Sequence, residues 1–173
     1  MRDRQPTEVF LGRAAELTQV ADVIARVEAG QPWLVDIEGD PGIGKTALAR
    51  HCLAGTGLRV VAARADQAES DLDFGLVDQL LRAAGRDSEL VVPVGGTGSA
   101  VSSFAVGARL LGMVGDQRSQ GPVAIRVDDL QWADRKSLEA LTFMLRRLSV
   151  DPVLAVVTYR GPSGRLPEPA AGG

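Results

Sequence analysis

The chain has little cysteine, few aromatic residues and no long apolar run, and each shortage excludes a class of protein. Its single cysteine, Cys52, rules out an internal disulfide and suits a reducing compartment. No apolar stretch is long enough to span a membrane, and the N-terminus lacks the pattern of a signal peptide. We therefore expect a cytoplasmic protein without a membrane partner.

A large excess of either charge is also missing. The formal net charge is −3, and the arginines are scattered along the chain. Because backbone contacts to nucleic acid need clustered cations, we expect no direct nucleic-acid binding by this segment. The composition is that of an ordinary globular domain, with 45% hydrophobic and 24% charged residues.

Lysine is the rarest charged residue, with two copies against seventeen arginines, and one copy completes a motif. The string Gly39-Asp40-Pro41-Gly42-Ile43-Gly44-Lys45-Thr46 matches the phosphate loop G-x-x-x-x-G-K-[ST]. Glycines let successive backbone N–H groups, here those of 42–47 including Ala47, point at phosphate oxygens. Lys45 would reach the β- and γ-phosphates, and Thr46 would bind Mg²⁺. The alternative is a glycine-proline turn with an incidental lysine.

The neighbours of this loop strengthen the phosphate-binding interpretation. Residues 33–38 form a mostly apolar run of strand length, and residues 47–54 are rich in alanine and leucine, as in a helix. A strand, a glycine loop and a helix in this order direct the helix N-terminus at an anion.

A second motif follows 83 residues after Lys45. Residues 123–129 are β-rich and end in Asp128 and Asp129, before Leu130-Gln131-Trp132-Ala133-Asp134. A carboxylate at such a strand end can hold Mg²⁺, which we assign to Asp128, and Asp129 could act as general base on the attacking water. The alternative is a strand ending in an Asp-Asp turn, with Asp134 capping the next helix. Arg126 is unusual in a buried parallel strand, and would face the sheet edge or pair with an acid.

The rest of the chain alternates between helices and strands. Apolar periodicity predicts helices over 14–28, 72–84 and 100–114 and one beginning at Asp134, and strands over 58–63 and 153–159. This order implies a parallel α/β sheet covered on both faces, with ligands beyond the carboxyl ends of the strands. The phosphate loop, Asp128, Asp129 and Arg160 all fall at that end.

Other features have structural explanations. The glycines at 95–98 lack a lysine and fit a loop better than a second phosphate site. We interpret His51 as a packed or surface residue and Cys52 as a small core residue. The predicted domains are a loose N-terminus over 1–8, a P-loop ATPase core over 9–160 and a flexible Gly/Pro/Ala-rich tail over 161–173.

Several segments together carry a family resemblance: FLGR-x-x-EL at 10–17, GDPGIGKT at 39–46, FGLV at 74–77, VDDLQWAD at 127–134 and VVTYR at 156–160. They resemble the AAA-like, STAND-class ATPase module at the N-terminus of large ATP-binding LuxR-family transcriptional regulators. The resemblance covers about 9–160. It implies an α/β P-loop NTPase (ASCE/AAA-like) fold, a three-layer sandwich with a mostly parallel sheet.

The resemblance also assigns residues and cofactors. Phe10 and Leu11 would border the adenine, although Phe10 could instead be a hydrophobic staple on the first helix. Arg160 would approach the γ-phosphate and report hydrolysis, with a solvated strand-end arginine as the alternative. Trp132 would pack under the site. ATP, rather than GTP, and Mg²⁺ are expected through this likeness alone.

The chain departs from the family at its end. Family members continue into a fifth core strand, a helical lid, a winged-helix region, a helical-repeat sensor and a C-terminal helix-turn-helix. This chain stops soon after Arg160, so we expect truncation before the last core strand and the lid, with DNA binding left to the absent part. The phosphate-loop strand would then lie at an open sheet edge, which leaves self-association open.

The leading hypothesis is a Mg·ATP-binding switch domain of a transcriptional regulator, with weak ATPase activity and ATP and ADP as ligands. Catalytic roles would fall to Lys45, Asp129 and Arg160. One alternative is a metabolite kinase or other P-loop phosphotransferase. Another is an interaction domain that binds nucleotide without hydrolysing it.

Overall fold

The computed structural model describes residues 14–87, 101–161 and 166. Within them, four strands form one parallel sheet in the order β1-β4-β3-β2. The strands are β1 (Trp33–Glu38), β2 (Arg59–Arg64), β3 (Val123–Asp128) and β4 (Val153–Tyr159). The bounds of β1 and β4 are those predicted, and β2 is shifted by one residue.

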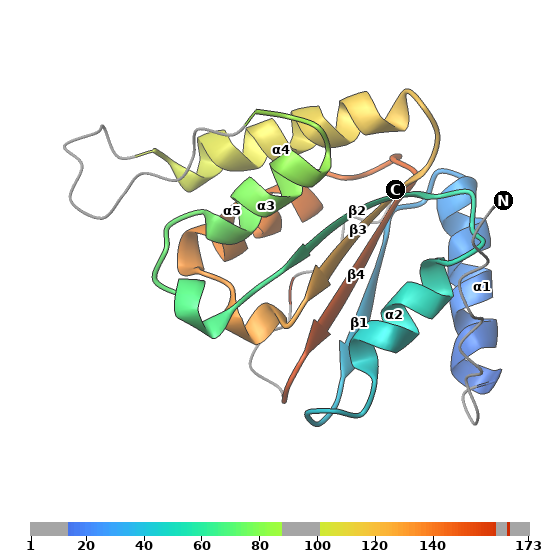
Figure 1. Cartoon of the computed structure of the whole chain (residues 1–173). Coiled ribbons are helices and arrows are strands. Elements are labelled where there is room, and N and C mark those ends of the chain that lie inside the picture. The colour runs from blue at the N-terminus through green and yellow to red at the C-terminus, as the bar shows by residue number, and fades with distance from the viewer. Residues whose placement is uncertain (1–13, 88–100, 162–165, 167–173) are drawn as a thin grey trace, which may run out of the picture.

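Helices cover both faces of the sheet, as Figure 1 shows, so the predicted three-layer α/β architecture is confirmed. On one face lie α1 (Ala14–Glu28) and α2 (Lys45–Leu53). On the other lie α3 (Gly75–Ala83), α4 (Ser103–Arg118) and α5 (Arg135–Leu145), with the short 3-10 helices η1 (Gln67–Glu69) and η2 (Leu130–Trp132) in the connections. Across the described part of the chain, no helix is both long and apolar enough to cross a membrane.

The central strand β4 explains why the sheet needs helices on both faces. All seven of its residues are buried. Side chains alternate between faces along a strand, so Val153, Ala155 and Val157 join the core under α3, α4 and α5. Leu154 and Val156 join a smaller core with residues of α1 and α2. A mostly apolar strand that is buried at every position is typical of the centre of a parallel sheet.

The strand that carries the phosphate loop is an edge strand. β1 pairs with β4 on one side, and among the described residues no strand pairs with its other side. None of its six residues is fully buried, and Trp33 is 37% exposed. The expected open edge is therefore seen in this part of the chain.

Three helices begin or end away from the predicted positions. α2 begins at Lys45, because the helix grows directly out of the phosphate loop. α3 begins at Gly75 and not at residue 72, because Phe74 takes a left-handed conformation with φ of 63°. α4 begins at Ser103 and not at residue 100, and the Ser102 hydroxyl caps it. The helix extends to Arg118, beyond the predicted residue 114.

Asp134 joins two helices, where only one cap was predicted. Its Oδ1 accepts hydrogen bonds from the Ser137 N–H (2.8 Å), which caps α5, and from the Phe74 N–H (2.9 Å), just before α3. Its Oδ2 accepts a longer bond of 3.4 Å from the Leu76 N–H. The Ser137 hydroxyl adds a bond from the Val77 N–H at 3.1 Å. The two helix starts therefore share one buried carboxylate for their unpaired N–H groups.

Candidate functional site

A cleft of about 470 Å³ opens at the carboxyl edge of the sheet. The phosphate loop and the first turn of α2 contribute one wall, made of Pro41, Gly42, Gly44, Lys45, Thr46 and Ala47. Arg50 of α2, Arg64 of β2, Asp129 after β3 and Arg160 after β4 complete the lining. The structure thus brings together two motifs that lie more than eighty residues apart in the chain.

Two glycines of the phosphate loop are needed for their backbone conformation and not because a side chain would clash. Gly42 and Gly44 have φ of 79° and 87°, in the left-handed region that side chains disfavour. At both positions a Cβ would meet no atom within 4 Å, so a substitution there would strain the backbone without a clash. At Gly39 the limit is space, because a Cβ would lie 3.2 Å from the Ile43 side chain.

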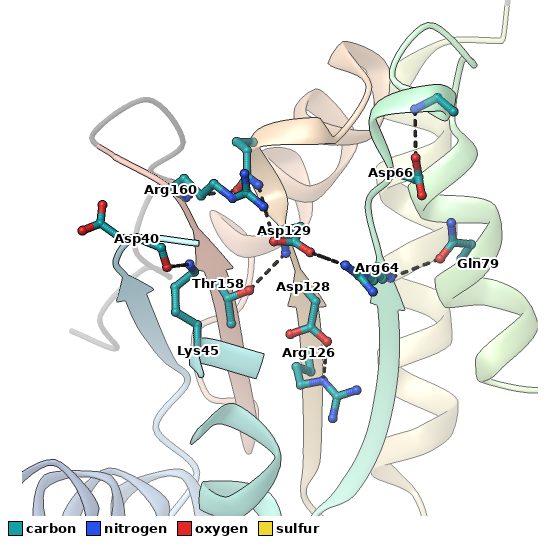
Figure 2. Close-up of polar contacts among 12 residues, drawn as sticks. Asp40, Lys45, Arg64, Asp66, Gln79, Arg126, Asp128, Asp129, Thr158 and Arg160 are labelled. Carbon is teal, nitrogen blue, oxygen red and sulfur yellow. Dashed lines mark hydrogen bonds and ion pairs between the residues drawn. The ribbon is translucent and has the colours of Figure 1, made fainter. Parts of the chain in front are cut away.

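The loop holds its own cation in place. The side chain of Lys45 is buried, and its Nζ donates hydrogen bonds to the carbonyl oxygens of Gly39 (2.7 Å) and Asp40 (2.9 Å), as Figure 2 shows for Asp40. An ammonium has three donors, so one remains for another acceptor. A positive charge is therefore held at the base of the loop, beside the half-buried Thr46.

Asp128 does not line the cleft, and one of its carboxylate oxygens has no hydrogen-bond partner. It is 2% exposed and occupies the same face of β3 as Ala124, which packs against α2. Its Oδ2 accepts from Arg126 Nε at 3.2 Å, which settles the place of that unusual arginine. Its Oδ1 has no hydrogen-bond partner. A buried carboxylate oxygen without a partner is costly, so its retention points to a ligand.

The chemistry of these oxygens fits a magnesium ion. Mg²⁺ is usually held by one or two protein oxygens together with waters and substrate phosphates. Asp128 Oδ1 and the Thr46 hydroxyl would suffice for that mode. Among the described residues, no group of three or more His, Cys, Asp or Glu side chains could hold a metal on its own. Any ion here would therefore depend on phosphate oxygens for much of its coordination.

Asp129 stands in the cleft with both carboxylate oxygens engaged. Oδ2 lies 3.0 Å from both Nε and an Nη of Arg64, and Oδ1 accepts from the Gln131 amide at 3.4 Å. Its backbone is left-handed, with φ of 56°, and its N–H donates to the Thr158 hydroxyl at 3.0 Å. Figure 2 shows the contacts of Asp129 with Arg64 and Thr158. These contacts fix the orientation of the Asp129 carboxylate and leave lone pairs on its oxygens for a water molecule.

Arg160 reaches the same cleft from β4. Its backbone N–H donates to Gln131 Oε1 at 3.1 Å, while its side chain lines the cleft. Gln131 therefore connects the end of β4 with the carboxylate of Asp129, through the two ends of one amide.

Sequence reasoning missed Arg50, Arg64 and Gln131. The cleft lining holds the cations Lys45, Arg50, Arg64 and Arg160 but only one carboxylate, although the chain as a whole is negative. Such a concentration of positive charge suits a polyanion. A signal did exist for Arg64, which follows a predicted strand at the same carboxyl edge, but the strand order that places it there is not written in the sequence.

Some predicted residues do not line the cleft. Phe10 and Leu11 lie outside the described residues, as do the glycines at 95–98. Gly39 and Asp40 act on the site through their carbonyl groups, and Ile43 points its side chain elsewhere, with 53% exposure.

Three residues flagged near the motifs lie in structural positions. Trp132 is partly buried against the larger core and does not line the cleft, as expected. Cys52 is buried and not bonded to another cysteine, and His51 is half-buried on α2.

Two solved structures show the same fold. One is described as the structure of Drosophila ORC bound to DNA, with a TM-score of 0.57 and 22% identity over 88% of this chain and 38% of the other. The second is Cdc6p from Pyrobaculum aerophilum, with a TM-score of 0.61 and 15% identity over 88% of this chain and 40% of the other. The chain thus spans about two fifths of each neighbour's length, and the likeness concerns fold alone.

Sequence comparison identifies the family. No curated protein sequence matches the chain. The profile of the AAA ATPase domain, in contrast, matches residues 9–157, which include the phosphate loop and the acidic end of β3. Because that match covers most of the sequence and agrees with the parallel sheet and the cleft, the chain belongs to the AAA ATPase domain family.

Proposed function

We propose that this domain binds Mg·ATP and hydrolyses it slowly, as a nucleotide switch of a bacterial LuxR-type transcriptional regulator. The observation that carries nucleotide binding is the cleft itself, in which a phosphate loop and four cations stand above a buried carboxylate oxygen that lacks a partner. A triphosphate with its metal supplies what each of these groups lacks: anionic oxygens for the cations, and a ligand for Asp128.

Each residue has a definite part in binding. The backbone N–H groups of 42–47 and the Lys45 ammonium would hold the phosphates, and Thr46 and Asp128 would hold Mg²⁺. When bound, Mg²⁺ neutralises charge on the β- and γ-phosphates. Because β4 alone separates β1 from β3, the strand ends that carry the loop and Asp128 are roughly 10 Å apart. A triphosphate with its metal bridges that separation.

Slow turnover follows from the partners of Asp129. Its carboxylate is held in one orientation by Arg64 and Gln131, so turning it toward a water molecule at the γ-phosphate would cost these contacts. Arg160, tied to Gln131 by its backbone, would sense whether that phosphate is present. A bound triphosphate would then favour one arrangement of this loop and a diphosphate another, which is the requirement for a switch.

The remaining assignments rest on the family likeness. Phe10 and Leu11 would border the adenine, the ATPase core would occupy 9–160, and 161–173 would be a flexible tail. The regulator context, with a lid, a helical-repeat sensor and a helix-turn-helix elsewhere in the parent protein, is supported by the segments FLGR-x-x-EL and VDDLQWAD. A cytoplasmic location and self-association belong to the same proposal.

The chain offers a matched test of nucleotide binding, since it has only two lysines. Lys45→Ala should abolish binding of a fluorescent ATP analogue in the presence of Mg²⁺. Lys136→Ala removes a more exposed lysine, paired with Asp73, and should bind like the wild type. Equal binding by the two variants would overturn the proposal.

Hydrolysis and context need separate experiments. Asp129→Asn should keep ATP binding and lose phosphate release, whereas transfer of phosphate to a metabolite would favour a kinase. The reading frame beyond residue 173 tests the regulator context. A helix-turn-helix there supports it, and a cyclase or kinase domain contradicts it.

A further inference from the structure

A second hollow, of about 560 Å³, lies between α4 and α5, on the face of the sheet opposite to α1 and α2. On its α5 side the hollow is lined at steps of three and four positions from Arg135 to Phe143, and then by Arg146 and Arg147 just beyond the end of the helix. Over α5, at 1.5 Å per residue, this stripe is about 15 Å long. It is distinct from the stripe that α5 buries in the core, so the helix has two working faces.

The floor of this hollow, which we call the groove, is apolar. Phe104 of α4 is 68% exposed and meets Phe143 of α5 edge to face, with ring centroids 5.5 Å apart. Leu138 lies beside them. Gly107 permits the close approach of α4, because a Cβ there would lie 2.6 Å from the Phe143 ring. Two aromatic rings in an open hollow indicate a docking surface rather than a random exposed residue.

The rim of the groove is positive, although the chain is negative. Among the described residues that line it, Glu139 is the one acid, and it is engaged by the Ser103 hydroxyl (2.8 Å) and by Arg135 (3.0 Å). The Ser103 hydrogen bond, followed by Arg135, lowers the pKa of Glu139, so this carboxylate stays ionised and balances Arg135. Because Glu139 pairs with Arg135, it does not neutralise the other arginines of the rim.

Two arginines just beyond the end of α5 carry the charge that Glu139 does not neutralise. Ion pairs among the described residues include none with Arg146 or Arg147. Arg147 lies over the Phe143 ring, 3.5 Å from its centroid, and donates to the Phe143 carbonyl at 3.2 Å. This contact fixes one guanidinium at the groove wall, where it can meet a carboxylate of an occupant.

We propose that this groove docks an acidic amphipathic helix of a partner protein. An occupant of about three turns matches the length of the stripe. Its apolar residues lie on Phe104, Leu138 and Phe143, and carboxylates near one of its ends meet Arg146 and Arg147. Charge complementarity selects this partner, because the uncompensated arginines repel a basic helix and leave a neutral one without its polar contacts.

A synthetic peptide tests the proposal without knowledge of the natural partner. The probe is a fluorescein-labelled peptide of about 15 residues, with leucine along one helical stripe and glutamate elsewhere. Fluorescence anisotropy should show saturable binding that weakens with salt. Phe104→Ala should weaken it about tenfold, since burial of an aromatic side chain is lost. The double variant R146E/R147E should weaken it by at least as much.

Two matched controls isolate the groove. Arg26→Glu changes an exposed arginine on α1, on the other side of the sheet, and should leave peptide binding unchanged. A peptide with lysine in place of every glutamate should bind at least tenfold more weakly. Lys45→Ala should also keep peptide binding, so failure of the nucleotide proposal and failure of this one give different results.

Three outcomes would overturn the proposal. The first is no binding up to about 1 mM peptide, because an affinity below that level is weaker than ordinary specific recognition. The second is equal binding of the glutamate and lysine peptides. The third is unchanged peptide binding by both groove variants. Sedimentation adds a further arm. A concentration-dependent dimer that Phe104→Ala abolishes would assign the groove to a second copy of this chain and contradict an acidic partner.

Discussion

Asp128 and Asp134 are both almost fully buried and lie six residues apart, yet their surroundings have opposite character. Asp134 is 4% exposed, and backbone N–H groups of two helices bind both of its oxygens. Asp128 is 2% exposed, and one oxygen has an arginine partner while the other has none. The first carboxylate is complete without any ligand, and the second is not.

This difference separates a structural joint from a binding site. A satisfied buried carboxylate stabilises the native state, because the unfolded chain cannot reproduce its geometry. An unsatisfied one costs free energy in the absence of a ligand and returns it when the ligand binds. Substitution at the two positions should therefore affect different quantities.

The largest effect on stability should come from Asp134→Ala. It removes two short hydrogen bonds to a charged acceptor and strands the N–H groups of Phe74 and Ser137 in the interior. We expect the free energy of unfolding to fall by about 3 kcal/mol, measured by urea denaturation. Asp134→Asn keeps an acceptor for both groups and should lose about half as much. A loss below about 0.5 kcal/mol in the alanine variant would remove the distinction between the two sites.

Asp128→Asn should give the reverse result. We expect the unfolding free energy without ligand to fall by less than the ~3 kcal/mol of Asp134→Ala, because asparagine keeps an oxygen acceptor for Arg126 while the anionic oxygen without a partner is removed. Wild-type protein at a hundredfold excess of Mg·ATP over its dissociation constant should gain about 2.7 kcal/mol. The variant should lose most of that gain. The check is urea denaturation with and without Mg·ATP, and an undiminished gain in the variant would contradict the site.

Arg64→Ala should have a smaller effect on stability, and its main effect should be on turnover. Arg64 is 74% exposed, so its ion pair with Asp129 contributes little stability, and the unfolding free energy should change by less than about 0.5 kcal/mol. Release of Asp129 should raise the rate of phosphate production, by about threefold if the pair is worth 0.6 kcal/mol. Arg82→Ala, which breaks a pair with the buried Asp78 outside the cleft lining, is the control for turnover. A slower Arg64 variant would mean that the guanidinium assists hydrolysis.

The smallest effect should come from Glu139, an exposed carboxylate that serves as a reference for the two buried ones. Its pKa is lowered by Ser103 and then by Arg135. A lowered folded pKa gives stability that is present above the unfolded pKa and is lost as pH falls through the folded value. The stability difference between wild type and Glu139→Gln should therefore shrink on acidification below pH about 4.3. A difference that grows there would contradict the assigned sign.

The sequence revealed the features that depend on local pattern. Continuous apolar runs located β1 and β4 to the residue, and the phosphate loop located the start of α2 to within two residues. Asp134 was recognised as a cap because a cap binds an N–H group only a few residues later in the same helix. Its second role involves Phe74, sixty positions earlier, and no local rule contains that separation.

The features that were missed depend on strand order. Arg64 and Asp129 pair because β2 and β3 are neighbours with Arg64 in register with Asp128, which only the assembled sheet shows. Arg126 is an exception: it was recognised as anomalous but not assigned, although its partner Asp128 lies only two residues later on the same face of β3. Phe74 delays the start of α3 by a left-handed turn, which propensity does not predict for a bulky residue.

The shared carboxylate of Asp134 has a mechanical consequence. It lies five residues after Asp129, and the chain between them contains a single turn of 3-10 helix. A movement of the loop that carries Asp129 would therefore displace Asp134. The carboxylate of Asp134 binds the starts of both α3 and α5. Those two helices would then move together, and α5 is also the helix that forms one wall of the groove.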